Sequence, residues 1–272
     1  MNLRLQKNQR IIRYLWLLGL AEKLRYMVNV FQWYQKDSDF VKRNPDFKVP
    51  PKTLAYDAYL VLDWDFYKQS DEEAVEFLAD ISKGYIPSAM SFRVLEWGCG
   101  GGSGRVIRHI PAAFTIETEI YASNCNPGTI NQCGENINHI RVFLNRLQSP
   151  LQFEEEYFDF IYSISVFTHL SEVVSHQWID ELFRIARLGG GLVITTNGDS
   201  WKNIMRPDEL EIYHAGEIII RDRFEEGKKM YWVCHSPKYL KKKLFSKFEV
   251  MKHIDGAFPY MGQDYWILRE PL

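Results

Sequence analysis

The sequence predicts an α/β protein with a doubly wound, mostly parallel β-sheet. From residue 92 to residue 197, short apolar segments alternate with amphipathic segments of helical spacing, which is typical of repeated βα units. A cluster of glycines also separates the first apolar segment from the helical spacing behind it, as in the first half of a βαβ unit. Because 46% of the 272 residues are hydrophobic, the chain can form a full core without disulfides.

The glycine cluster follows the predicted strand Phe92–Trp97 directly. Its five glycines in seven positions allow a tight turn and a close approach of the backbone to a ligand. Gly98, Gly100 and Gly102 have G-x-G-x-G spacing, and Ser103 fits the dinucleotide fingerprint G-x-G-x-x-G poorly. The cluster therefore predicts a ligand loop, with a turn that binds nothing as the alternative.

An acid, Glu96, stands two residues before the first glycine, at the tip of the strand. A carboxylate there repels a pyrophosphate and suits a cationic ligand. S-adenosylmethionine carries an ammonium and a sulfonium group and no phosphate. The stretch from Val94 to Arg105 resembles motif I of the class I S-adenosylmethionine-dependent methyltransferases.

The resemblance continues behind the second and third predicted strands. Family members usually have an acid that binds the ribose hydroxyls where this chain has Asn124, followed by Cys125. Because a carboxylate accepts hydrogen bonds better than an amide oxygen, Asn124→Asp is expected to tighten cofactor binding. Asn145, Arg146 and Leu147 lie where the family reads the adenine ring, commonly with Asp, so a backbone N–H of Leu147 would serve instead.

Phe158–Leu170 and Arg187–Gly198 resemble a group of these methyltransferases often associated with bacterial glycan and natural-product biosynthesis. Leu188 replaces the usual proline of that group, and Asn197 stands where it often has His. The resemblance implies the following cofactor-binding residues: Glu96, Gly98, Cys99, Gly100, Gly102, Asn124, Cys125, Asn145, Arg146, Leu147, Ser163 and Ser165.

The remaining elements follow from the alternation of apolar and polar residues. Further strands are expected at 117–123, 140–144, 158–164 and 191–197, and helices at 103–110, 127–138, 172–187 and 237–246. A hairpin at 216–223 and 229–234 precedes two closing strands, Phe248–Met251 and Tyr265–Leu268. A terminal hairpin of this kind is what the methyltransferase fold has, so the resemblance implies a Rossmann-like, seven-stranded sheet with one antiparallel strand.

Residues 1–90 are expected to form an N-terminal helical extension and lid, ahead of a methyltransferase domain at 91–272 with a substrate-side insert at about 198–235. A predicted helix at 9–35 is apolar on most sides and needs a partner: its own domain, a second copy of the chain or a membrane surface. Its apolar stretch Ile11–Leu20 is too short and too charged to span a bilayer.

Two further expectations concern the region before the first strand. Asp71 is expected to cap a helix that ends near Lys83. A group of aromatic side chains offers flat faces that suit a sugar ring, with a plain core as the alternative: Tyr56, Tyr59, Trp64 and Tyr67.

The net charge of −2 argues against a general nucleic-acid binder. The four cysteines form no C-x-x-C pair, so the sequence predicts neither a metal site nor a disulfide framework and favours a reducing compartment. No secretory signal is visible at the N-terminus. These observations predict a cytoplasmic protein.

Methyl transfer is an in-line displacement, and an oxygen nucleophile needs a base near its hydroxyl proton. His169, Asp199 and His235 qualify by their positions behind the predicted strands. The alternatives are a helix cap for His169, a turn residue for Asp199 and a helix cap for His235.

The sequence therefore predicts a methyltransferase that uses S-adenosylmethionine, acting on an oxygen of a sugar, a glycan or a small metabolite. Asn124, Arg146 and Leu188 favour one alternative, a cofactor-binding relative without activity that serves as a scaffold or a regulatory protein. A dinucleotide oxidoreductase is a second alternative, which Glu96 and the glycine spacing disfavour.

Overall fold

The computed structural model describes residues 3–59, 62–84, 92–100, 104–114, 117–258 and 261–271. The chain divides into two compact units, Met1–Tyr67 and Lys68–Leu272, and the division falls within one helix. No helix of the described residues is long and apolar enough to cross a membrane. The expected domain boundary near residue 90 stays a prediction.

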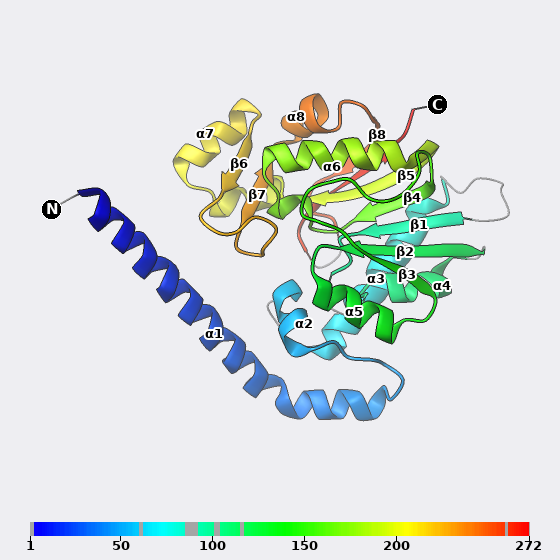
Figure 1. Cartoon of the computed structure of the whole chain (residues 1–272), viewed down its shortest axis with the longest axis horizontal. Helices are drawn as coiled ribbons and strands as arrows, with labels where there is room; N and C mark the ends of the chain where they lie inside the picture. The colour runs from blue at the N-terminus through cyan, green and yellow to red at the C-terminus, as the bar shows by residue number, and fades with distance from the viewer. Residues whose placement is uncertain are drawn as a thin grey trace. The chain divides into compact units, whose positions relative to one another are not determined.

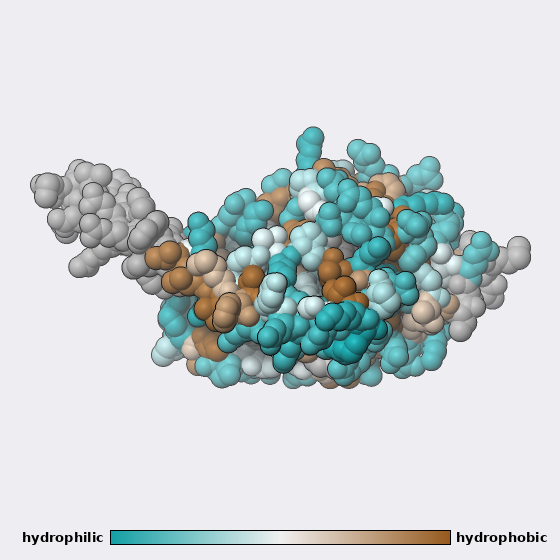
Figure 2. Space-filling view, turned by 90° about the horizontal axis from the view of Figure 1, so that it is seen from below, coloured by the Kyte–Doolittle hydropathy of each residue, from teal (hydrophilic) through white to brown (hydrophobic). Residues whose placement is uncertain are grey.

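The first unit consists of α1 (Leu3–Arg43), α2 (Lys52–Tyr59) and the start of α3 (Trp64–Ser82). Its small core buries aromatic side chains that the sequence assigned to a sugar ring: Tyr56, Trp64 and Tyr67. For these three residues the expected sugar-binding face was wrong and the alternative, a plain core, holds, because each is at most 4% exposed. The side chain of Tyr59 lies outside the described residues. Figure 2 shows that α1 also has hydrophobic residues on its surface.

The helix expected to start at Asp71 starts earlier, at Trp64, because another aspartate caps it. The carboxylate of Asp63 accepts a hydrogen bond from the Phe66 backbone N–H at 3.1 Å, so Asp63 holds the first turn of α3. Asp71 instead lies within α3, fully buried, and forms an ion pair with Arg105 at 3.2 Å.

The second unit is built on one seven-stranded sheet in the order β3-β2-β1-β4-β5-β9-β8 (Figure 1). The strands are β1 Phe92–Trp97, β2 Thr118–Asn124, β3 Ile140–Leu144, β4 Phe158–Ser163, β5 Ala186–Thr196, β8 Glu249–Ile254 and β9 Asp264–Arg269. β9 runs antiparallel to both of its neighbours, and β1 to β5 are parallel. The predicted Rossmann-like sheet with one antiparallel strand is therefore confirmed.

Helices cover both faces of this sheet (Figure 1). α6 (Glu172–Ile185) packs on one face, and α3, α4 (Ile110–Ala113) and α5 (Pro127–Asn136) pack on the other. The side chains of β1 alternate between the two cores, with Leu95 and Trp97 in one and Val94 in the other. The strand order reverses between β1 and β4, where ligands bind in sheets of this kind.

The expected insert contains η3 (Asp199–Ile204), α7 (Pro207–Ala215) and the hairpin of β6 (Ile218–Arg221) and β7 (Trp232–His235). The hairpin was predicted, and α7 was not. The helix expected at 237–246 is a short α8 (Pro237–Tyr239) that continues as a π-turn, Leu240–Leu244.

Candidate functional site

The glycine loop at the end of β1 is held by its neighbours on both sides. The backbone N–H groups of Gly98 and Cys99 both donate to the Ser123 carbonyl, at 2.8 and 2.9 Å. Gly98 has a φ of +84°, and a Cβ there would lie 2.1 Å from a methyl of Val166, so the position requires glycine. Gly102 lies outside the described residues.

Glu96 lies beside this loop and is only 3% exposed. Its carboxylate accepts a hydrogen bond from the Tyr162 hydroxyl at 2.9 Å. Burial raises the pKa of Glu96 to about 7, and the Tyr162 hydrogen bond opposes this rise. Glu96 is therefore a carboxyl that exchanges its proton near neutral pH, and Tyr162 is a partner that the sequence did not identify.

The amide of Asn124 holds the glycine loop, which gives a physical reason for the missing acid. Its Nδ2 donates to the Cys99 carbonyl at 2.7 Å, and its Oδ1 accepts from the Asn126 N–H at 2.7 Å. A carboxylate has no N–H to donate and cannot make the first of these bonds. The neighbouring Cys125 is exposed.

Asn145 has a buried oxygen without a partner at the end of β3. Its Nδ2 donates to the Arg146 carbonyl at 2.6 Å, whereas its Oδ1 has no hydrogen bond among the described residues. The Leu147 carbonyl accepts from the indole N–H of Trp178 at 2.6 Å, and Arg146 is exposed. Buried polar atoms are normally paired, so the Asn145 oxygen is an acceptor that the described residues leave without a donor, and its place in a cofactor site stays a prediction.

Ser163 and Ser165 lie at the end of β4 and differ in their hydrogen bonding. The buried hydroxyl of Ser163 has no hydrogen bond among the described residues. Ser165 has a φ of +60°, and its N–H donates to the Thr195 hydroxyl at 2.7 Å. Its own hydroxyl accepts from Nε2 of Gln263 at 2.8 Å. A non-glycine residue in this conformation persists only where its surroundings hold it, which is common at functional sites.

His169 ends a short 3-10 turn behind β4, and the cap of α6 is Ser171 rather than His169. Its Nδ1 lies 2.7 Å from the Tyr231 carbonyl, which can only accept. Nδ1 therefore carries the proton, and Nε2 has a free lone pair. Burial lowers the pKa of His169, so the ring is neutral at pH 7.

The hairpin of the insert fixes this histidine from outside. The Gly227 N–H donates to the His169 carbonyl at 2.9 Å, and a Glu226 carboxylate oxygen accepts from the Ser171 N–H at 2.6 Å. Together with the Tyr231 contact, these bonds join the β6–β7 loop to the end of β4.

The two other candidate bases are placed less well. Hydrogen bonds from Lys202 at 2.8 Å and Tyr213 at 2.6 Å occupy one oxygen of Asp199. Partial burial raises the pKa of Asp199, but these two bonds outweigh it and leave the pKa below its usual value. His235 is fully buried, burial lowers its pKa to about 3, and Ser236 rather than His235 caps α8. Both residues stay predictions that this geometry does not favour.

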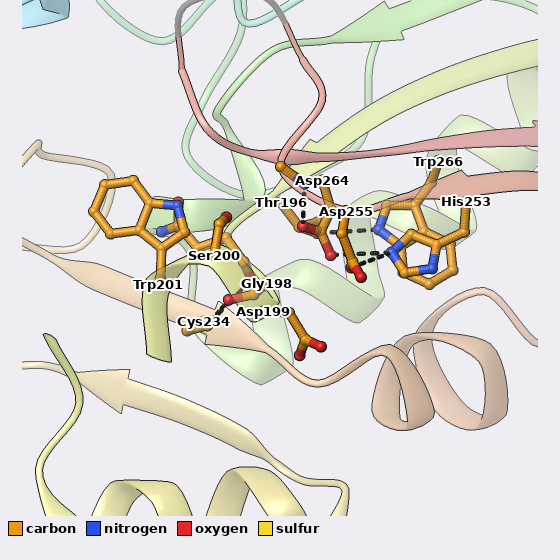
Figure 3. Close-up of polar contacts among 12 residues, drawn as sticks. Thr196, Gly198, Asp199, Ser200, Trp201, Cys234, His253, Asp255, Asp264 and Trp266 are labelled. Atoms are coloured by element: carbon orange, nitrogen blue, oxygen red, sulfur yellow. Dashed lines mark hydrogen bonds and ion pairs between the residues drawn. The ribbon is translucent and has the colours of Figure 1, made fainter. Parts of the chain in front are cut away.

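A polar group at the same edge of the sheet consists of His253, Asp255 and Asp264 (Figure 3). Nε2 of His253 lies 3.0 Å from Asp264 and 3.5 Å from Asp255, and its ring stacks on Trp266 at 3.7 Å. The three ligating atoms lie within 4.8 Å of one another, close enough to share a cation. The contacts of His253 with these two carboxylates account for the same geometry without a metal, so the expected absence of a metal stays a prediction.

Comparisons with known proteins agree with this fold. Residues 94–190 match the family model described as a methyltransferase domain, from β1 into β5. No curated protein matches the chain.

Three solved structures resemble it in fold. A putative sarcosine dimethylglycine methyltransferase from Galdieria sulphuraria is 13% identical with a TM-score of 0.51, covering 75% of this chain and 86% of that one. A chain of the complex between the Haloferax volcanii Trm112 methyltransferase activator and the putative methyltransferase is 14% identical with a TM-score of 0.51, covering 80% and 96%. The PH0226 protein from Pyrococcus horikoshii OT3 is 15% identical with a TM-score of 0.50, covering 75% and 91%.

The strand order, the glycine loop and the domain match together define the class of this protein. It is a class I methyltransferase enzyme, and its cofactor is S-adenosylmethionine.

Proposed function

We propose that this enzyme transfers the methyl group of S-adenosylmethionine to an oxygen of a sugar, a glycan or a small metabolite. The tautomer of His169 carries this proposal. Its Nδ1–H is bound to the Tyr231 carbonyl, so Nε2 is a base with a free lone pair at the edge of the sheet where ligands bind.

The residues at this edge fit the proposed cofactor. The free oxygens of Asn145 and Ser163 are buried acceptors without partners among the described residues, and adenine and ribose offer donors of the matching kind. The Glu96 carboxyl suits a cation. We therefore keep the following residues as the proposed cofactor contacts: Glu96, Gly98, Cys99, Gly100, Gly102, Asn124, Cys125, Asn145, Arg146, Leu147, Ser163 and Ser165.

The protein's own part in the reaction is positioning and proton transfer. S-adenosylmethionine supplies an electrophilic methyl group on its sulfonium. As the methyl group passes from the sulfonium sulfur to the acceptor oxygen and S-adenosylhomocysteine is released, Nε2 of His169 would take the hydroxyl proton of the acceptor. The Tyr231 carbonyl still accepts from Nδ1–H and stabilises the imidazolium that results.

A cofactor-binding relative without turnover is the second candidate, and Asn124 favours it. Both polar atoms of its amide are engaged within the protein, so the charged ribose contact of the family is missing here. We further propose a cytoplasmic location, which the four free cysteines support.

Two measurements test these proposals in sequence. Calorimetric titration is expected to show binding of S-adenosylhomocysteine and no binding of NAD. A screen of sugars, glycans and cell extract with isotope-labelled S-adenosylmethionine is then expected to yield an O-methylated product by mass spectrometry. Binding without any labelled product would favour the inactive relative, and labelled product on nitrogen or carbon would overturn the oxygen assignment.

A further inference from the structure

Helix α1 has two apolar stripes between Leu20 and Val41. One stripe packs into the core of its own unit through Tyr26, Val30, Trp33 and Phe40. The other lies on the surface and consists of Leu20, Leu24, Met27, Phe31, Tyr34 and Val41, with the exposed Val28 at its flank. Phe31 is 86% exposed and Tyr34 is 71% exposed, so the second stripe is not part of that core.

The exposed stripe has a heptad period. Its first five members are separated by 4, 3, 4 and 3 residues, and Val41 follows Tyr34 by one whole heptad. An apolar seam with an average spacing of 3.5 residues is the pattern along which two helices supercoil around each other. A helix that lies in a membrane surface has a wide apolar face instead.

The surface of α1 also has the shape that such a seam needs. A groove is lined by Tyr26, Met27, Val30, Phe31 and Tyr34. Four of these residues, Met27, Val30, Phe31 and Tyr34, stand at positions i, i+3, i+4 and i+7. In a coiled coil, four residues so arranged form the hole that receives one side chain of the facing helix.

We propose that α1 pairs with α1 of a second copy of this chain. Leu24 and Phe31 occupy a positions, and Leu20, Met27, Tyr34 and Val41 occupy d positions. In this pair the Phe31 side chain of each copy fills the hole formed by Met27, Val30, Phe31 and Tyr34 of the other copy. One helix therefore has both the hole and the side chain that fills it. Such self-complementarity is the property of a two-fold interface.

The size of the stripe agrees with a stable pair. The distance from Leu20 to Val41 is roughly 32 Å along the helix, or three heptads. If each side chain of the stripe buries on the order of 100 Å² on pairing, their summed buried area approaches the roughly 800 Å² per partner of a standard protein interface.

The test compares two neighbouring exposed positions in the full chain by analytical ultracentrifugation. Phe31→Glu places a charge in the seam, and Gln32→Glu places the same charge beside it, outside the stripe. The natural chain and the Gln32 variant are expected at twice 32.1 kDa, and the Phe31 variant at 32.1 kDa with a dimer Kd raised at least about 100-fold. Circular dichroism checks that both variants keep their helices.

Three results would overturn the dimer. The natural chain sediments as a monomer at every concentration, which would leave the stripe to the second unit of the same chain. The Phe31 variant stays as dimeric as the control. The natural chain is monomeric and floats with vesicles of phosphatidylcholine and phosphatidylglycerol, and the Phe31 variant does not, which would assign the stripe to a lipid surface. Binding of S-adenosylhomocysteine is expected to be equal in all three proteins.

Discussion

The fold raises the pKa of the buried Glu96 carboxyl, and this makes the stability of the protein depend on pH. Its folded pKa of about 7 lies above the ordinary 4.5, so the folded protein holds this proton more tightly than the unfolded chain does. The resulting stability is fully present below pH 4.5 and is lost as the pH rises through about 7. Relative to Glu96→Gln, the natural protein is expected to lose about 3 kcal/mol of unfolding free energy over this range. Urea denaturation at a series of pH values measures the difference.

Tyr162→Phe is the companion variant for this experiment. The Tyr162 hydroxyl stabilises the charged form of Glu96, so its removal is expected to raise the pKa of Glu96 further. Stability curves of the natural protein and the Glu96 variant that run parallel over the whole pH range would show that this carboxyl does not titrate there.

Asn124→Asp is expected to weaken cofactor binding, which reverses the expectation from the sequence. The sequence considers only the acceptor strength that a ribose contact needs. In the structure Nδ2 donates to the Cys99 carbonyl, and a carboxylate would place an acceptor against an acceptor at 2.7 Å. The cost of an unpaired, repelled group is about 1–3 kcal/mol, or roughly 5- to 150-fold in affinity if the loop shifts. Titration with S-adenosylhomocysteine measures it, and tighter binding would restore the earlier expectation.

His169→Ala is expected to lower turnover by about 10²–10⁴, the usual range for loss of a general base, with cofactor affinity unchanged. Because burial lowers the pKa of His169, the natural enzyme is expected to lose activity only on the acid side of 6.5 and to show a plateau at neutral pH. The pH profile of kcat with a labelled acceptor measures this. A variant that keeps both its rate and its acid limb would remove His169 from the reaction.

At the scale of the elements, the side chain of Gln263, directly before β9, forms hydrogen bonds with residues at or just behind the ends of β4 and β5. Gln263 accepts from the Thr195 hydroxyl at 2.7 Å and donates to the Ser165 hydroxyl at 2.8 Å and to Asn197 at 3.3 Å. It is 4% exposed, so Gln263→Leu would leave the Thr195 hydroxyl without its acceptor and the Asn197 oxygen without its donor, whereas the Ser165 hydroxyl keeps Thr168 at 3.0 Å as a partner. A loss of about 1–3 kcal/mol per orphaned group is expected in urea denaturation.

Gln263→Glu is the matched control for this prediction. It keeps the acceptor for Thr195 and loses the donor to Ser165, so its loss of stability is expected to fall between those of the natural protein and the Leu variant. Equal stability of the Leu variant and the natural protein would show that the left-handed conformation of Ser165 is held by other contacts.

The central strands β1, β4 and β9 could be predicted because they are buried on both faces. Such a strand is a continuous apolar run, and the turns between strands have their own signals, as with β1 and the glycine loop. The start of α3 was missed because two aspartates, Asp63 and Asp71, both fit a cap, and only the structure shows which one accepts the N–H. α7 was missed because its hydrophobic residues have almost no helical periodicity.

The candidate site was less predictable because its partners come from distant parts of the chain. Tyr162 contacts Glu96 across 66 residues, and Gln263 contacts Ser165 across 98. A signal for Gln263 was present: a polar residue directly before an antiparallel strand lies at the same edge as the ends of the parallel ones. No local pattern could show that Nδ1 of His169 would meet the Tyr231 carbonyl.

For the whole molecule, the two compact units have separate hydrophobic cores. The first unit depends on a few large aromatic side chains, and Phe40 of α1 is 1% exposed among them. Phe40→Ala leaves a cavity there and is expected to cost about 3–5 kcal/mol. Gln32→Ala, at an exposed position of the same helix outside the stripe, is the control and is expected to leave the stability of the first unit's core unchanged.

Differential scanning calorimetry separates the two units if they unfold independently. Phe40→Ala is then expected to lower the Tm of one transition, while the transition that S-adenosylhomocysteine raises stays where it is, because ligand binding stabilises only the unit that holds it. A single transition that Phe40→Ala lowers and the ligand raises would mean that the units unfold as one. The first unit would then contribute directly to the stability of the methyltransferase unit, and its variants would have to be judged by their effect on the cofactor site as well.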